Sequence, residues 1–168
     1  GGKTFHDNSP EWIRTALEGC LRRLDTEFVD LYQIHYRDEV TPLDDVVATL
    51  LDLRDAGKIR HFGLSNAGQA DVDELGQHRD VFASVQDEFS LANRSHEADL
   101  EILQSEFGLT SMTWGSLGQG ILSGKYDAST SFGPEDRRSR PIYVNFHGEK
   151  LQHNLAIVEV LREIALDL

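Results

Sequence analysis

The sequence predicts an α/β fold built on a parallel sheet, because strand-like and helix-like segments alternate along it. Four short apolar segments are typical of strands: residues 28–35, 59–64, 82–87 and 109–114. A helical pattern follows each of the first three, and the fourth leads into a glycine-rich loop before the next helix. Each segment ends in polar or aromatic side chains, at the strand end where parallel α/β folds bind ligands.

Four βα units amount to about half of a closed (β/α)₈ barrel, which takes roughly 250 residues. A freestanding half would leave two open sheet edges, which natural proteins avoid. The first residue is Gly1 rather than Met, and the apolar helical pattern of residues 158–168 has no stop signal. We therefore expect the 168-residue chain to be a piece of a longer protein, inactive and poorly stable in isolation.

Apolar side chains at helical spacing predict the helices that connect the strands. The first helix begins after Ser9, a favourable N-cap, with Pro10 at its first position. A capping-box pattern at residues 41–44 opens the second helix. Further helices are expected near residues 69–79 and 95–107, and from about 150 onward. Residues 124–149 are polar and irregular, a length typical of a functional lid or a disordered segment.

The composition is that of a globular protein with an acidic surface. Hydrophobic residues make up 39% and charged residues 27% of the chain, which argues against disorder. The formal net charge of -13 disfavours nucleic acid and anionic membranes as partners, since both are negatively charged. The single cysteine, Cys20, cannot form an internal disulfide, which fits a reducing, cytoplasmic compartment. The sequence shows no signal peptide and no apolar run of membrane-spanning length.

Polar side chains end the first three strands and are the candidates for chemistry. His35 ends the first strand, and the sequence is equally compatible with a histidine at the rim and with a hydrogen-bonded histidine in the core. Ser65 and Asn66 follow the second strand; they form a turn or cap, or they offer a hydroxyl and an amide to a carboxamide. Gln86 lies in an apolar strand, where a buried amide needs structural partners or a ligand. The strand ends converge on one rim, which favours the functional interpretation.

The fourth strand ends in an aromatic residue and a glycine-rich loop. Trp114 is either a core residue or a platform for a flat ring, since glycines beside it would leave its face open. The backbone N–H groups of the loop suit phosphates; its residues are Gly115, Ser116, Leu117, Gly118, Gln119 and Gly120. The loop lacks the Lys-Ser/Thr pair of a P-loop, and the seven histidines lack the spacing of metal ligands. Together the strand ends suit a dinucleotide, with groups for a nicotinamide ring, its carboxamide and a pyrophosphate.

Four ordered blocks of the sequence resemble the aldo-keto reductase family and together span nearly all of the chain. They are ALEGCLRRL with VDLYQIH (residues 16–24 and 29–35), AGKIR with GLSN (56–60 and 63–66), VQDEFSL with NR (85–91 and 93–94), and GQGILSGKY (118–126). The resemblance implies a TIM (β/α)₈ barrel, of which residues 1–168 would be one partial domain from roughly the middle half. It also implies reversible NADPH-dependent reduction of aldehydes and ketones, a small-molecule carbonyl substrate, and NADP(H) as the cofactor.

The resemblance also assigns roles to the strand ends. His35 matches the histidine of the family's catalytic tetrad, which orients the substrate carbonyl. Ser65, Asn66 and Gln86 match the residues that hold the nicotinamide carboxamide. Trp114 stands where the family usually has a stacking Tyr, and the loop of residues 115–120 matches the loop over the pyrophosphate.

The chain departs from the family pattern in several places. The family's catalytic Asp, Tyr and Lys would all precede Gly1, so Lys3 is not the catalytic lysine, and the residues that bind the 2′-phosphate would follow Leu168. Asp87 replaces a more usual Asn, and Gly115 a more usual Ser or Pro. Two alternatives stay open. One is a non-catalytic NADPH-binding regulatory subunit similar to potassium-channel β subunits, although these have Asn at the position of His35. The other is an inactive fragment.

Overall fold

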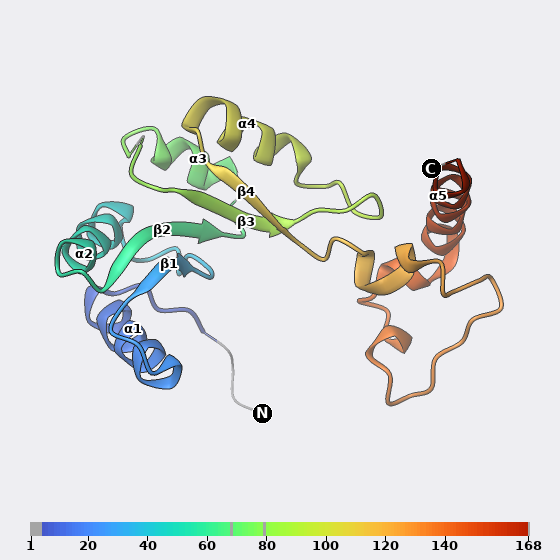
Figure 1. The fold of residues 1–168 in the computed structure, drawn as a ribbon, viewed down its shortest axis with the longest axis horizontal. Coiled ribbons are helices and arrows are strands. Elements are labelled where there is room, and N and C mark those ends of the chain that lie inside the picture. Colours follow the sequence, from blue (N-terminus) through green and yellow to red (C-terminus); the bar gives the residue numbers. More distant parts are fainter. Residues whose placement is uncertain (1–4, 68, 79, 168) are drawn as a thin grey trace. The chain divides into compact units, whose positions relative to one another are not determined.

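A computed structural model describes residues 5–67, 69–78 and 80–167. Its strands and α-helices alternate as the sequence predicts (Figure 1). In chain order they are α1 (Pro10–Leu24), β1 (Val29–Ile34), α2 (Leu43–Asp55), β2 (Ile59–Ser65), α3 (Gln69–Leu75), β3 (Ser84–Glu88), α4 (Glu97–Phe107), β4 (Thr110–Trp114) and α5 (Gly148–Leu166). Short 3₁₀ helices lie between β4 and α5: η1 (Gly118–Ser123), η2 (Arg137–Ser139) and η3 (Val144–Phe146).

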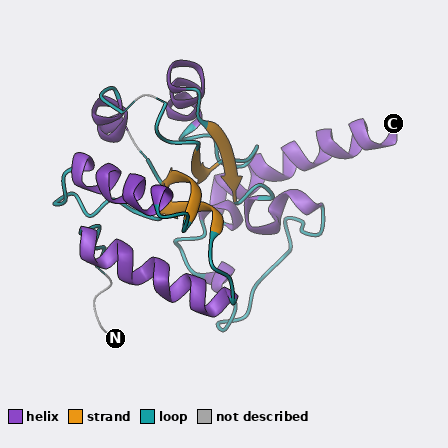
Figure 2. Ribbon diagram, turned by 60° about the vertical axis from the view of Figure 1, so that its left-hand side comes forward, coloured by secondary structure: helices purple, strands orange, loops and turns teal. Residues whose placement is uncertain are grey.

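The four strands form one sheet in the order β1-β2-β3-β4, and the β1–β2 and β2–β3 pairs are parallel. Consecutive parallel strands joined by right-handed crossovers place their connecting helices on the same side of a sheet. Accordingly, α2 and α3 lie with α1 and α4 on one side of the strands, and the other face carries no helix of this part of the structure (Figure 1, Figure 2). The predicted α/β fold with a parallel sheet is confirmed.

The chain separates into two compact units, each of which we describe by itself. The sheet unit comprises residues 1–87 and 96–112, and the C-terminal unit comprises residues 88–95 and 113–168. In the sheet unit the apolar faces of the helices pack on alternate strand residues, which removes apolar surface from water. This core contains Ile13, Leu17, Val46, Leu50, Phe62, Leu64, Val85 and Leu103, all at most 2% exposed.

The C-terminal unit packs around aromatic side chains of the long loop. Tyr126, Phe132 and Phe146 meet edge to face, with ring centroids 5.1–5.7 Å apart. The Arg138 guanidinium lies 4.6 Å from the centroid of the Phe132 ring, within the range of cation–π attraction. Residues 124–149 are therefore a folded loop with its own 3₁₀ turns rather than the disordered segment that was one of two expectations.

The helix starts test the capping predictions. The Ser9 hydroxyl accepts a hydrogen bond from the Trp12 N–H at 3.3 Å, so the predicted N-cap of α1 is confirmed. The capping box of α2 is wrong, because the N-cap is Pro42 and no side chain caps the helix. The Thr41 hydroxyl instead donates to Asp38 Oδ2 at 2.7 Å, a charge-assisted hydrogen bond that directs it toward the loop before the helix. Within the described part of the chain, no helix is both long and apolar enough to cross a bilayer.

Candidate active site

The carboxyl ends of β1 and β2 bring three of the predicted residues together. The side-chain amide of Asn66 donates to the backbone carbonyl of His35 at 2.9 Å and to the hydroxyl of Ser65 at 3.1 Å. Asn66 has a φ of 55°, in the left-handed region that Asn tolerates better than most residues. This turn lets one amide join two neighbouring strand ends, with the Ser65 side chain buried and Asn66 half-buried.

Gln86 joins the same cluster from β3. Its Cα pairs in register with that of Ser65, and its backbone carbonyl accepts the Asn66 N–H at 2.8 Å. Its side-chain Oε1 accepts a hydrogen bond from Gln33 Nε2 at 2.5 Å. The sheet unit thus places four predicted residues on neighbouring strand ends, and each of them is linked to another by a hydrogen bond.

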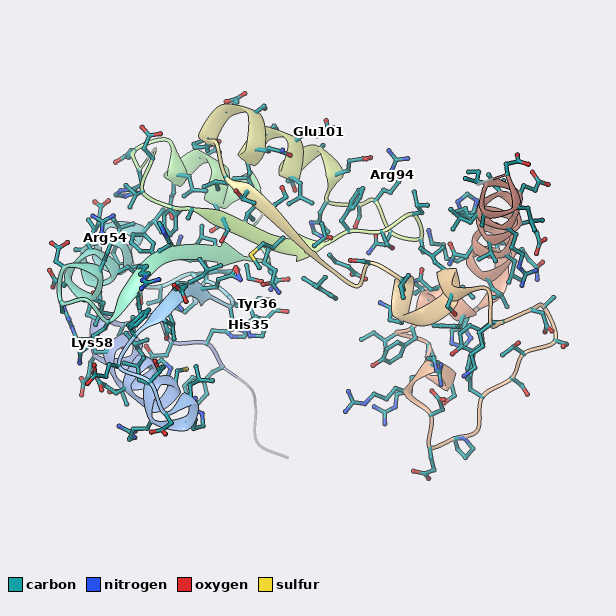
Figure 3. All side chains as sticks on the ribbon, in the orientation of Figure 1. His35, Tyr36, Arg54, Lys58, Arg94 and Glu101 are labelled. Carbon is teal, nitrogen blue, oxygen red and sulfur yellow. The ribbon has the colours of Figure 1, made fainter. Side chains whose placement is uncertain are left out.

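His35 presents its ring at the rim of the sheet. The side chain is exposed, and its ring lies 4.5 Å from that of Tyr36, which in turn lies 4.7 Å from that of His6. No group among the described residues hydrogen-bonds to the imidazole nitrogens, so they remain available to a ligand. Figure 3 shows His35 and Tyr36 at one end of the sheet and Lys58, which precedes β2, at the other. His35 is therefore a rim residue and not a satisfied core histidine.

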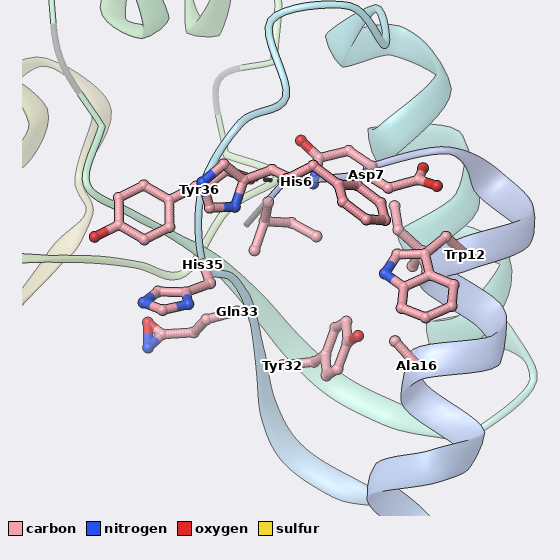
Figure 4. A pocket seen from close by; sticks show the side chains of 12 residues that line it. His6, Asp7, Trp12, Ala16, Tyr32, Gln33, His35 and Tyr36 are labelled. Atoms are coloured by element: carbon pink, nitrogen blue, oxygen red, sulfur yellow. Dashed lines mark hydrogen bonds between the residues drawn. The ribbon is translucent and has the colours of Figure 1, made fainter. Parts of the chain in front are cut away.

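A cavity of about 200 Å³ adjoins His35 between α1, β1 and the segment before α1 (Figure 4). Aromatic residues provide much of its wall, among them Trp12, Tyr32 and Tyr36. Burial, with a smaller contribution from the Cys20 thiol, raises the pKa of Tyr32 to about 12. Tyr32 is therefore a neutral phenol at any physiological pH.

The loop after His35 is held to the segment before α1 by a reciprocal pair that the sequence did not reveal. The Asn8 N–H donates to Asp38 Oδ2 at 2.7 Å, and the Asp38 N–H donates to Asn8 Oδ1 at 2.8 Å. Asn8 Nδ2 also donates to the Tyr36 carbonyl at 3.1 Å. Burial alone would raise the pKa of Asp38, but hydrogen bonds from Asn8, Thr41 and Val40 outweigh it and hold that pKa well below its usual range.

The C-terminal unit contains the glycine-rich loop. Gly115, Gly118 and Gly120 have φ values of 68°, 57° and 103°, and Gln119 has 56°. At Gly118 a Cβ atom would lie 2.8 Å from the Cβ of Ala92, so a larger residue does not fit there. A right-handed residue followed by a left-handed one turns successive N–H groups toward one side, and Leu117 (φ -98°, ψ 13°) followed by Gly118 makes such an anion-binding concavity.

The backbone N–H groups of Ser116 and Leu117 have no protein acceptor among the described residues. Those of Gly118 and Gly120, in contrast, donate to the carbonyls of Gly115 and Leu117. The loop therefore offers free donors to a phosphate.

A series of side-chain hydrogen bonds within the C-terminal unit holds this loop in place. Gln119 Nε2 donates to Glu88 Oε1 at 3.1 Å, and Gln119 Oε1 accepts from Asn145 Nδ2 at 2.6 Å. The fully buried Asn154 of α5 donates to the Asn145 carbonyl at 3.1 Å. Gln119 therefore supports the loop from within the unit. The Trp114 side chain is 38% exposed, so it is not a core residue among the described residues.

Other residues discussed from the sequence lie elsewhere. Asp87 is buried on the helix side of β3, with Oδ2 3.9 Å from His96 Nδ1, so it does not pair with Glu88. Lys3 lies outside the described residues. Gln33, Asn8 and Asp38 were missed as site residues. A polar side chain two positions before His35 was a usable signal for Gln33, whereas the Asn8–Asp38 pair is 30 residues apart and has no local signal.

The model of the aldo/keto reductase family matches residues 3–167. The chain belongs to this family. The resemblance seen in the sequence is therefore confirmed, and the sheet of this chain is part of a TIM barrel.

Among curated aldo-keto reductases, the chain is 29% identical to YhdN of Bacillus subtilis over 91% of its own length and 45% of that protein. It is 31% identical to the probable aldo-keto reductase 1 of Glycine max, over 95% of the chain and 45% of the relative. The chain thus spans about half the length of the curated relatives it matches.

Solved structures agree with this assignment. The glycerol dehydrogenase AKR11B4 of Gluconobacter oxydans matches with a TM-score of 0.86 and 32% identity, over 98% of the chain and 50% of that protein. An aldo/keto reductase of Klebsiella pneumoniae in complex with NADP and acetate matches with a TM-score of 0.59 and 34% identity, over 64% of the chain and 38% of its own.

Proposed function

We propose that the full-length protein is an NADPH-dependent aldo-keto reductase that interconverts a small aldehyde or ketone and its alcohol. The observation that carries the proposal is the hydrogen-bonded cluster of His35, Ser65, Asn66 and Gln86 at neighbouring strand ends. The cluster combines a ring N–H that can hold a carbonyl oxygen with a hydroxyl and amides that can hold a carboxamide. The Klebsiella pneumoniae relative in complex with NADP supports the choice of cofactor.

The sheet unit carries residues that fit the nicotinamide end of a dinucleotide, and the loop of the C-terminal unit fits a pyrophosphate. Ser65, Asn66 and Gln86 would hold the nicotinamide carboxamide through their hydroxyl and amide groups. The open imidazole of His35 donates to the substrate carbonyl and orients it for attack. Ser116 and Leu117 bind the pyrophosphate through their backbone N–H groups, within a loop whose glycines leave room for it. Bound NADPH supplies the hydride.

Trp114 is predicted to stack on the nicotinamide ring, because its half-open side chain lies beside Gly115. Addition of NADP⁺ to the full-length protein should then quench indole emission by contact, and Trp114→Ala should lose most of that quenching. NADP⁺ is preferable to NADPH here because reduced nicotinamide also accepts energy from distant indoles.

Trp12→Phe is the matched control, since Trp12 is the other tryptophan within residues 1–168 and is exposed on α1. Calorimetric titration separates the outcomes. If NADP⁺ binds and Trp114→Ala quenches as strongly as the wild type, the stacking role is wrong. If no NADP⁺ binds to the wild type, the proposed cofactor is wrong.

The isolated 168-residue chain is predicted to show no NADPH-dependent carbonyl reduction above background. It carries one position of the family's tetrad, His35, and the sheet edge at β1 has no further strand among the described residues. Open edges promote association, so the chain should elute above its monomer mass in size-exclusion chromatography. A monomeric preparation with turnover would contradict this expectation.

A further inference from the structure

The inner face of the sheet, which carries no helix, has a gap in its side chains at Gly63. Gln33, Gly63 and Ser84 lie in one row across β1, β2 and β3, because Gln33 pairs with Gly63 and Gly63 with Ser84. A Cβ at Gly63 would lie 2.3 Å from Ser84 Oγ and 2.7 Å from the Ser84 carbonyl oxygen. The backbone contact means that no larger residue is accommodated without moving the strand.

This gap lets one side chain cross a strand. β1 and β3 are separated by β2, so their backbones are roughly 10 Å apart. Gln33 nevertheless reaches Gln86, with 2.5 Å between Nε2 and Oε1. Ser84, which lies two positions before Gln86 on β3, has a side chain too short to block the path.

The direction of this bond determines how Gln86 presents its amide. Gln33 donates and Gln86 Oε1 accepts, so the acceptor end of Gln86 is occupied and its NH₂ group forms the free end. A carboxamide oxygen needs a donor, and that is the end left available. Without a partner at Oε1 the Gln86 amide could rotate by half a turn and present an acceptor instead.

Among the described residues, the Gln33 amide has a single hydrogen-bond partner, Gln86. Its Oε1 is buried and has no hydrogen-bond partner among the described side chains and backbone. A buried acceptor without a partner destabilises the folded state, so a leucine would serve the core better at this position. His35 lies two residues after Gln33, so by strand alternation both side chains face the same inner side (Figure 4). The position of Gln33 therefore fits a role in the site better than a role in packing.

We propose that Gln33 is a positioning residue that fixes the amide orientation of Gln86 across Gly63, so that Gln86 donates to the nicotinamide carboxamide. The inference rests on the proposed function, because it needs Gln86 to bind that carboxamide. Gln33 itself touches neither cofactor nor substrate. It acts only through Gln86. The effect of replacing Gln33 should therefore disappear once Gln86 has been replaced, and this can be tested.

A double-mutant cycle in the full-length protein tests the dependence. Gln33→Leu should weaken NADPH binding on the order of tenfold, and Gln86→Leu at least as much. The double variant should be no weaker than Gln86→Leu alone, because Gln33 has nothing left to orient. Gln104→Leu on the exposed face of α4 is the matched control and should leave the affinity unchanged.

Two readouts separate positioning from general loosening of the fold. Adenosine 2′,5′-bisphosphate has no nicotinamide, so Gln33→Leu should bind it as well as the wild type does. The thermal midpoint of Gln33→Leu should stay equal or rise, because the substitution removes a buried acceptor without a partner. If Gln33 has only a structural role, Gln33→Leu should lower both the affinity for the bisphosphate and the thermal midpoint.

The outcomes are distinct. Additive effects in the double variant, or an equal loss of bisphosphate and NADPH affinity, would overturn the positioning role while the proposed function stands. A wild-type protein that binds the bisphosphate and not NADPH would refute the carboxamide site and the inference together. A wild type that binds neither ligand would refute the proposed cofactor.

Discussion

Replacing His35 with Ala in the full-length protein should lower kcat for carbonyl reduction on the order of 10²–10⁴-fold, the usual worth of a positioned proton-handling group. NADPH affinity should change by less than about threefold, because the cofactor contacts that we propose come from other residues. The reason is geometric. The exposed imidazole lies at the strand end, and the backbone of His35, not its ring, holds Asn66. Truncating the ring therefore leaves the carboxamide cluster intact.

His153→Ala is the matched control, since His153 lies exposed on α5. His35→Gln keeps an N–H donor and should recover part of the lost turnover. Unchanged turnover in His35→Ala would exclude the catalytic role. Loss of NADPH binding with the loss of turnover would make His35 a structural residue.

The fold was predictable because its signals are local. Ser9 and Pro10 mark the start of α1, Gly108 ends α4 in the left-handed conformation that favours glycine, and each strand lies within two residues of its expected bounds. The capping box at residues 41–44 failed for the opposite reason. Thr41 is satisfied by Asp38, a loop carboxylate whose position depends on the tertiary structure and not on the helix sequence.

The same difference between local signals and long-range contacts decides which site residues could be predicted. Residues at strand ends were predictable, because parallel strands bring their carboxyl ends to one edge whatever the details of packing. Side-chain partners were not. The reach of Gln33 over Gly63 to Gln86 depends on the register of three strands, and the order Gln33–Gly63–Ser84 becomes visible only when that register is known. The support of Gln119 by Asn145 likewise depends on how the long loop folds back.

Asp38 is the site's other long-range contact, and its carboxylate is saturated with donors. Oδ2 accepts the Asn8 N–H and the Thr41 hydroxyl, each at 2.7 Å. Oδ1 accepts the Val40 N–H at 3.0 Å and the Thr41 N–H at 2.8 Å. In Asp38→Asn one of these oxygens becomes an NH₂ group facing two donors. We expect this variant to lose roughly 2–4 kcal/mol of unfolding free energy.

The loss should depend on pH in a defined direction. Because the pKa of Asp38 is lowered on folding, the unfolded chain takes up the proton first as the pH falls. The stabilisation by this carboxylate is therefore complete above the unfolded pKa, about 3.9, and declines as the pH falls below that value toward the folded pKa. The asparagine variant does not titrate at this position, so the gap between wild type and variant should be constant from pH 7 to 5 and should narrow below about pH 4.

Urea unfolding of the full-length protein and of Asp38→Asn at pH 7, 5 and 3.5 measures this gap directly. Asp73→Asn, at an exposed position of α3, is the matched control and should shift the midpoint little at any of these pH values. A gap that keeps its size at pH 3.5 would mean that the variant disturbs packing and that the charge of Asp38 is not what holds the loop. A gap that narrows there would support the view that one ionised carboxylate ties the residues after His35 to the segment before α1, as its four accepted hydrogen bonds indicate.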